Sequence, residues 1–135
     1  MTVLAGLSGL RVLVVEDDTL IALQIEEVLQ DLGCVVIGPA GKLDAAMRMA
    51  DGEAVDAAIL DVNIRGGHVF PVAERLRARG VPFALASGYG DWALPEAFRN
   101  QPRLTKPLTA HELQAQVLSL QRGRGVAERA GPSPA

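Results

Sequence analysis

Short apolar runs recur along the chain and are separated by segments of mixed polarity. The most uniform run is Ala57-Ala58-Ile59-Leu60, and Asp61 follows it directly. A strand with one solvated face alternates apolar and polar residues, so this run indicates a parallel strand covered by helices on both sides. Similar runs predict four further strands, at residues 11–15, 34–38, 82–86 and 103–105.

The segments between these strands carry apolar residues at helical spacing. Ile21, Ile25, Val28 and Leu32 form one face of a helix predicted from about Thr19, with Asp17 or Asp18 as its cap. Further helices are predicted at residues 42–51, from about 69 to 80, and from about 108 to 121. Residues 91–100 have a weak helical pattern that Pro95 interrupts. Arg75, Arg77 and Arg79 predict a solvated face on the third helix.

This alternation of strands and helices predicts an α/β fold with a parallel sheet and right-handed crossovers. Five such units suggest a flavodoxin-like (βα)5 three-layer sandwich with strand order 2-1-3-4-5 and a shortened fourth helix. We predict one domain over residues 9–121, with an N-terminal extension at 1–8. Residues 122–135, rich in glycine and proline, predict a disordered tail.

Composition narrows the classes of function. The 135 residues have a net charge of −3, which gives no electrostatic support for nucleic-acid binding. No apolar run approaches the roughly 20 residues of a membrane span. Cys34 is the only cysteine and there is no signal-peptide pattern, so we expect a cytoplasmic protein. We further expect a monomer or a weak dimer.

Polar residues stand at the ends of the predicted strands. Glu16 and Asp17 end the first strand and Asp61 the third, while Ser87 and Lys106 end the fourth and fifth. In the predicted strand order, the first and third strands are neighbours, so their three carboxylates should converge. Two charges about 4 Å apart repel by on the order of 4 kcal/mol at an effective dielectric near 20. Protons or a cation must offset this repulsion, and Mg²⁺ suits such oxygen ligands.

A cation and a lysine around one carboxylate suggest phosphoryl chemistry. They would withdraw charge from a phosphoryl group and let Asp61 attack phosphorus, a known form of covalent catalysis. Ser87 would donate a hydrogen bond to one phosphoryl oxygen. Lys106 is one of only two lysines, the other being Lys42, and it offers a compact positive charge.

The sequence resembles the receiver domain of bacterial response regulators over roughly residues 9–121. The motifs are VLVVEDD (12–18), ILDVNI (59–64), ASGYG (86–90) and LTKP (104–107), in order at strand ends. The resemblance implies that Asp61 is the phosphoacceptor and that Glu16 and Asp17 organise Mg²⁺ together with the Asn63 main-chain carbonyl. It also implies that Ser87 is the switch residue, that Lys106 is the family's lysine, and that the bond before Pro107 is often cis.

Two features depart from the usual family pattern. Arg103 occupies the position in the fifth strand where the family has its switch aromatic residue, and the span from Ser87 to Lys106 is short. Both features resemble a subgroup of stand-alone receivers whose fourth strand reads Phe-Ala-Thr-Gly-Tyr. That resemblance implies a shifted switch, with Tyr89 as the candidate aromatic.

The function expected from these residues is that of a single-domain response regulator. A histidine kinase or phosphotransfer protein would phosphorylate Asp61, and the output would be a protein contact or competition for phosphate. The only chemistry expected is self-phosphorylation and autodephosphorylation, so we do not expect an enzyme in the usual sense.

Several alternatives remain open. The chain could be a pseudo-receiver that binds partners without phosphorylation. A Mg²⁺-dependent phosphatase with an aspartyl nucleophile is disfavoured because Asn63, rather than a second acid, lies two residues after Asp61. At single positions, Glu16 and Asp17 could simply cap a helix, and Ser87 could be a turn former. His68 is interpreted as a helix-start residue rather than a catalytic base.

Overall fold

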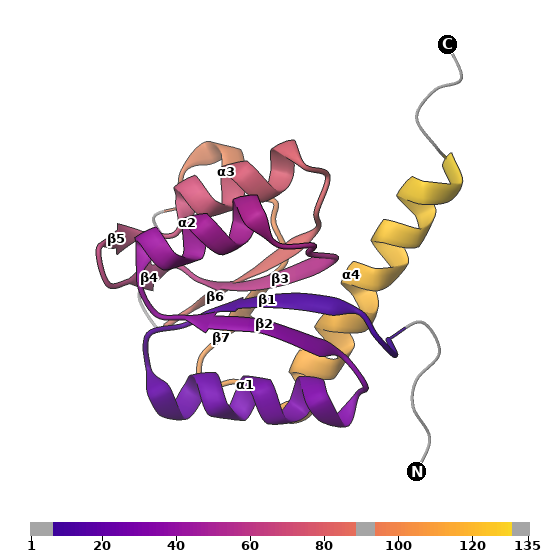
Figure 1. The fold of residues 1–135 in the computed structure, drawn as a ribbon, viewed down its shortest axis with the longest axis horizontal. Helices are drawn as coiled ribbons and strands as arrows, with labels where there is room; N and C mark the ends of the chain where they lie inside the picture. The colour runs from indigo at the N-terminus through magenta and orange to yellow at the C-terminus, as the bar shows by residue number, and fades with distance from the viewer. Residues whose placement is uncertain (1–6, 89–93, 131–135) are drawn as a thin grey trace.

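A five-stranded parallel sheet forms the centre of the molecule (Figure 1). The computed structural model describes residues 7–88 and 94–130, with only the backbone for 123–130. The sheet order is β2-β1-β3-β6-β7, which confirms the predicted order 2-1-3-4-5. Its strands are β1 (Arg11–Val15), β2 (Val35–Ala40), β3 (Ala57–Asp61), β6 (Phe83–Ser87) and β7 (Arg103–Thr105).

Helices cover both faces of this sheet. They are α1 (Thr19–Asp31), α2 (Leu43–Gly52), α3 (Phe70–Ala78) and α4 (Ala110–Ala130), with a 3-10 helix η1 (Glu96–Phe98). Alternate strand residues point to opposite faces: Leu13 and Leu60 pack with α2 and α3, whereas Val14 and Ile59 pack with α1 and α4. The result is the predicted three-layer sandwich, with helices above and below the sheet in Figure 1.

The cap of α1 is Asp18. Its Oδ1 accepts the backbone N–H groups of Leu20 at 3.0 Å and Ile21 at 3.1 Å. This contact satisfies two of the amide groups that a helix leaves unpaired at its start. The capping role left open between Asp17 and Asp18 therefore belongs to Asp18, and Asp17 does not take part in it.

Strand β2 is longer than predicted. It was expected to end at Gly38, but it continues through Pro39 to Ala40. Proline is tolerated here because β2 is an edge strand of the sheet. Gly38 has φ +96°, and a Cβ there would lie 2.8 Å from Ala40 N and 2.9 Å from Val14 O. The extension matters for the site because Ala40 O accepts the N–H of Glu16 at 2.9 Å.

Ordered elements extend beyond the predicted limits of the domain at both ends. Leu7 was placed in the N-terminal extension, but it is fully buried in the core cluster between the sheet, α1 and α4. The last helix was expected to end near Gln121, but its backbone is helical to Ala130. Isolated glycines cost roughly 1 kcal/mol each relative to alanine, which weakens a helix rich in Arg, Ala and Glu without ending it. The backbone of 122–130 is thus helical, 131–135 lie outside the described residues, and the disordered tail stays a prediction.

The segment before β7 contains little helix, as the predicted shortened fourth helix implies. Within its described part, 94–101, the regular element is η1, which begins directly after Pro95. The remainder of the predicted weak helix, 91–93, lies outside the described residues.

Arg75 and Arg77 of α3 and Arg79 at its C-cap are exposed, as predicted, and they also contact neighbouring elements. Arg75 lies 3.1 Å from Asp51 of α2, and Arg79 donates to the carbonyl of Glu53 at 3.0 Å. Arg77 lies over the Phe98 ring, with 4.5 Å between its Cζ and the ring centroid. These contacts tie α3 to α2 on one side and to η1 on the other.

Candidate phosphoryl-transfer site

Buried polar side chains collect at one edge of the sheet. Among the described residues, the buried polar side chains are Glu16, Asp61 and Ser87, each 3 to 4% exposed. Glu16 follows β1, whereas Asp61 and Ser87 are the last residues of β3 and β6. Because all these strands are parallel, their carboxyl ends meet at the same edge, as predicted. Ser87 pairs with Thr105 in the ladder between β6 and β7, so it is a strand residue and not merely a turn former.

Lys106 lies between two of the buried carboxylates. Its Nζ is 2.8 Å from Glu16 Oε1 and 3.1 Å from Asp61 Oδ2. Its backbone N–H donates to Ser87 O at 2.9 Å, which fixes the start of its side chain next to β6. The peptide bond between Lys106 and Pro107 is cis, as the family resemblance implied.

Asp17 adds a third carboxylate to this edge. Carboxylate oxygens of Glu16, Asp17 and Asp61 all lie within 4.8 Å of one another. Asp17 is half-buried and, together with Glu16, Gly41 and Arg65, lines a hollow of about 400 Å³. Glu16 Oε1 is buried and lies 2.8 Å from the Lys106 ammonium group, but one ammonium group cannot balance three carboxylates at this spacing. An oxygen-rich cluster with surplus negative charge fits a hard divalent cation.

The close spacing of these charged groups shifts the pKa values of Asp61 and Lys106. The pKa of Asp61 is raised to about 7, first because burial disfavours its charged form and then because of the charge of Glu16 and a hydrogen bond to it. Lys106 offsets only part of this increase. Burial alone would lower the pKa of Lys106, but its hydrogen bonds to Glu16 and Asp61 and their charges raise it.

Asn63 lies in a small hairpin that sequence reasoning missed. Its backbone N–H donates to Asp61 Oδ1 at 3.3 Å, and its side-chain Oδ1 accepts from His68 Nδ1 at 3.0 Å. The hairpin consists of β4 (Asn63–Ile64) and β5 (Gly67–His68), where a loop and a helix start were predicted. The available signal was Gly66 in the two-residue turn Arg65-Gly66, since glycine in such a turn marks a hairpin. Gly66 indeed has φ +96°.

The structure thus brings together every predicted site residue that it describes. Carboxylate oxygens of Glu16, Asp17 and Asp61 lie close together, and Lys106 contacts Glu16 and Asp61. Ser87 ends the neighbouring strand, and Asn63 follows Asp61 in the hairpin. Tyr89, the predicted switch aromatic, lies outside the described residues. Arg65, which lines the hollow, was not predicted, because nothing in its local sequence distinguishes it from other exposed arginines.

The fold and this edge together define a doubly wound α/β domain with an acidic pocket at the carboxyl ends of its strands. Comparison with known proteins identifies the family. The family described as the response regulator receiver domain matches residues 12–118, so the chain belongs to that family. A search of curated proteins finds no match. No helix in the described part of the chain has the length and apolar character needed to cross a bilayer.

Solved structures agree with this assignment. SdrG from Sphingomonas melonis Fr1 is 38% identical, with a TM-score of 0.74, over 84% of this chain and 97% of that one. A structure of the BeF3-activated conformation of SdrG, attributed to Pseudomonas melonis Fr1, is 39% identical, with a TM-score of 0.70, over 84% and 98% of the two chains. A CheY-like receiver domain protein from Methanospirillum hungatei JF-1 shares 19% identity and a TM-score of 0.76, over 88% and 98%, which shows the fold alone.

Proposed function

We propose that this receiver domain accepts a phosphoryl group on Asp61 from a sensor histidine kinase or a histidine phosphotransfer protein, in a Mg²⁺-dependent reaction. The observation that carries the proposal is the position of Asp61. It is a buried carboxylate at the end of a wholly apolar strand, 3.1 Å from Lys106 and next to Glu16 and Asp17. A stable domain would not place these like charges together without a use for a cation there.

The covalent step is a displacement at phosphorus. A carboxylate oxygen of Asp61 forms a bond to phosphorus while the bond from phosphorus to the imidazole nitrogen of the donor breaks. The nitrogen keeps the electron pair of that bond. Asp17, Asp61 and the main-chain carbonyl of Asn63 would hold Mg²⁺, with Glu16 beside them, and the bound ion would supply positive charge to the phosphoryl oxygens.

Lys106 would provide the second positive charge. Its ammonium group already lies 3.1 Å from Asp61 Oδ2, so it reaches the position of an oxygen on a phosphorylated Asp61 without a long movement. Ser87 ends the adjacent strand β6 and would donate its hydroxyl hydrogen to a phosphoryl oxygen.

Protonation of Asp61 opposes the reaction, because only the ionised carboxylate is a good nucleophile. With a pKa of about 7, Asp61 in the metal-free protein is substantially protonated at neutral pH. A divalent cation among the three carboxylates favours the ionised form, since an opposite charge lowers a carboxyl pKa. The positive charge of the cation therefore explains both why phosphorylation needs Mg²⁺ and how Asp61 is kept ionised as the nucleophile.

The proposed output is a phosphorylation-dependent contact with a protein partner, or competition for phosphate within a phosphorelay. The proposed location is the cytoplasm, where phosphohistidine donors of this family act. The related SdrG has a BeF3-activated conformation, which supports beryllofluoride as a phosphoryl mimic for this chain too.

Intact mass measurement tests the proposal directly. The protein is incubated with acetyl phosphate, with Mg²⁺ or with EDTA, and we expect a gain of roughly 80 Da only with Mg²⁺. Borohydride reduction followed by peptide mapping should place the label on Asp61. No gain in mass, or a label on another carboxylate, would overturn the assignment.

A further inference from the structure

The hairpin after β3 connects Asp61 to a group of aromatic side chains. The backbone N–H of Asn63 donates to Asp61 Oδ1 at 3.3 Å, and Nδ1 of His68 donates to the Asn63 side chain at 3.0 Å. The rings of His68 and Phe70 follow, with 5.9 Å between their centroids. Asp61 is thus three contacts away from Phe70, which lies at the start of α3.

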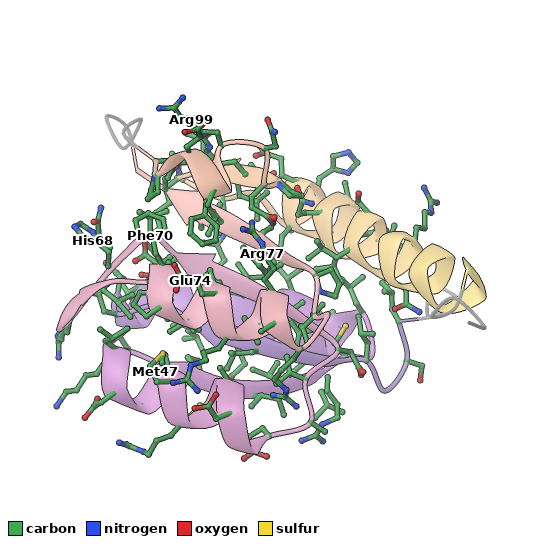
Figure 2. All side chains as sticks on the ribbon, turned by 90° about the horizontal axis from the view of Figure 1, so that it is seen from above. Met47, His68, Phe70, Glu74, Arg77 and Arg99 are labelled. Carbon is green, nitrogen blue, oxygen red and sulfur yellow. The ribbon has the colours of Figure 1, made fainter. Side chains whose placement is uncertain are left out.

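The aromatic contacts continue from Phe70 to η1. The rings of Phe70 and Phe98 are stacked, with centroids 5.3 Å apart and an interplanar angle of 20°. Phe98 is 1% exposed, so it anchors η1 to the body of the domain. Figure 2 shows His68 and Phe70 side by side at the N-terminal end of α3, with Arg77 further along the same helix. Phe70 therefore joins the hairpin to η1.

Arg77 and Gln101 hold the other side of this segment. The Arg77 guanidinium lies over Phe98 and donates to Gln101 Oε1 at 3.1 Å. Gln101 in turn donates to the carbonyl of Phe83 in β6 at 3.1 Å. Residues 94–101 thus have one attachment through Phe70, which leads to Asp61, and another through Arg77 and Gln101, which leads to the later part of α3 and to β6.

These two attachments differ in their relation to Asp61. The hairpin is short, with two residues in each strand, and is tied to the start of α2 by a backbone hydrogen bond from Leu43 N to Arg65 O at 2.9 Å. Its first residue, Asn63, contacts Asp61 directly. The attachment through Arg77 includes no residue of the acidic cluster. A change at Asp61 would therefore reach η1 through the hairpin.

We propose that Asn63, His68, Phe70 and Phe98 form a coupling route that transmits the state of Asp61 to residues 94–101. The proposal rests on the function proposed above. A cation and a phosphoryl group at Asp61 would take up oxygens that Asn63 now contacts, and the Asn63 side chain would shift with its backbone. His68 and Phe70 would then move against Phe98, which shifts the population of η1 between two arrangements. Strand β7, with Arg103 as its first residue, plays no part in this route.

The backbone amides of η1 provide the measurement. The N–H of Phe98 donates to Pro95 O at 2.9 Å and that of Gln101 to Phe98 O at 3.2 Å, so both amides report on this segment. Hydrogen exchange and NMR shifts of residues 94–101 are recorded with Mg²⁺ alone and with Mg²⁺ plus beryllofluoride. In the wild type, beryllofluoride should change both.

Two variants interrupt the route at different contacts. His68→Phe keeps a ring beside Phe70 but removes the donor to Asn63, and Phe70→Leu removes the stack on Phe98 while keeping an apolar side chain. Each should reduce the response of residues 94–101 roughly threefold or more, and the double variant should lose little beyond either one. The matched control is Glu74→Gln, an exposed residue of α3 one turn after Phe70, which should leave the response unchanged.

The outcomes separate this proposal from the proposed function. If beryllofluoride binds and residues 94–101 respond equally in the wild type and both variants, the coupling route is wrong while the phosphoacceptor assignment stands. If beryllofluoride does not bind the wild type, the proposed function fails. In that case, the NMR shifts of the proteins without beryllofluoride test the coupling route. His68→Phe should still shift the Phe98 and Gln101 amide signals, and Glu74→Gln should not.

Discussion

Two aspartates lie at opposite ends of strand β3 and have different surroundings. Asp56 precedes the strand, is half-buried, and accepts the backbone N–H of Arg11 through Oδ2 at 2.9 Å. Asp61 ends the strand, is 4% exposed, and shares Lys106 with Glu16. The same functional group is a local hydrogen-bond acceptor at one end and a member of a charged cluster at the other.

The neighbouring residues explain the difference. At the amino end of β3, Asp56 lies next to the backbone N–H of Arg11 and accepts its hydrogen bond. At the carboxyl end, Glu16 and Asp61 arrive side by side from the neighbouring parallel strands β1 and β3. Their charges therefore need a lysine or a metal ion. The comparison shows that the end of the strand, and not the residue type, separates an aspartate in a single backbone hydrogen bond from the aspartate in the charged cluster, which we propose as the phosphoacceptor.

The largest expected effect is the loss of phosphorylation in one aspartate variant and not in the other. Asp61→Asn should abolish the roughly 80 Da gain in mass with acetyl phosphate and Mg²⁺, because the amide is not a nucleophile for phosphorus. Asp56→Asn should be labelled like the wild type, since its side chain lies at the far end of the strand from the acidic cluster. Intact mass spectrometry measures both, and equal labelling of the two variants would remove the functional distinction between the two ends of β3.

The next effect concerns the cation at the reactive end. Lys106→Arg keeps the positive charge but replaces a compact ammonium with a wider planar group, so the contacts of 2.8 and 3.1 Å cannot both be retained. We expect the rate of labelling by acetyl phosphate to fall on the order of tenfold or more. Lys42→Arg changes the other lysine, which lies outside the contacts of Asp61, and should label at the wild-type rate. An unchanged rate in Lys106→Arg would mean that any cation suffices.

A third effect distinguishes neighbouring carboxylates within the reactive end. Mg²⁺ at a hundredfold excess over its Kd should stabilise the wild type by about 2.7 kcal/mol, seen as a rise in Tm. Asp17→Asn should lose most of that rise, because Asp17 belongs to the cluster of three carboxylates. Asp18→Asn should keep it, since Asp18 caps α1 and asparagine caps a helix equally well. A full Mg²⁺ response in Asp17→Asn would place the metal elsewhere.

A fourth, smaller effect is on the pH dependence of stability without metal. The folded-state pKa of Asp61, about 7, lies above the ordinary value of a carboxyl group, so the folded protein holds this proton more tightly than the unfolded chain. The free energy of unfolding should therefore fall as pH rises from about 4 to about 7, by up to roughly 1 kcal/mol per pH unit from this group. Urea unfolding in EDTA measures it. Asp61→Asn should lack this component, and an identical pH profile in that variant would show that a different group produces the slope.

The smallest effect is expected at the amino end of β3. Asp56→Ala removes the acceptor for the Arg11 N–H and should lower the free energy of unfolding by about 1 kcal/mol. Its labelling by acetyl phosphate and its Mg²⁺ response should match the wild type. Urea unfolding at fixed pH gives the first value. A loss of labelling in Asp56→Ala would show that the two ends of the strand are not independent.

The positions of strands and helices were predicted correctly where the apolar pattern along the chain is strong. The order of the sheet, the strand that ends at Asp61 and the α1 face through Ile25 and Leu32 all match the structure. The errors lie where local signals are weak or opposed. Pro39 obscures the end of β2, and two glycines obscure the continuation of α4. The loop predicted at 64–67 is instead part of a hairpin whose turn is Arg65-Gly66.

Patterns along the chain are enough to place Glu16, Asp61, Ser87 and Lys106 at one edge of a parallel sheet. Apolar runs set the strands, strand direction sets the edge, and both are local properties of the chain. Only the tertiary structure decided that Lys106 contacts Glu16 as well as Asp61, and that His68, Phe70 and Phe98 join the hairpin to η1. These contacts join side chains from separate elements, so their distances depend on how the sheet, α3 and η1 pack, which no local pattern encodes.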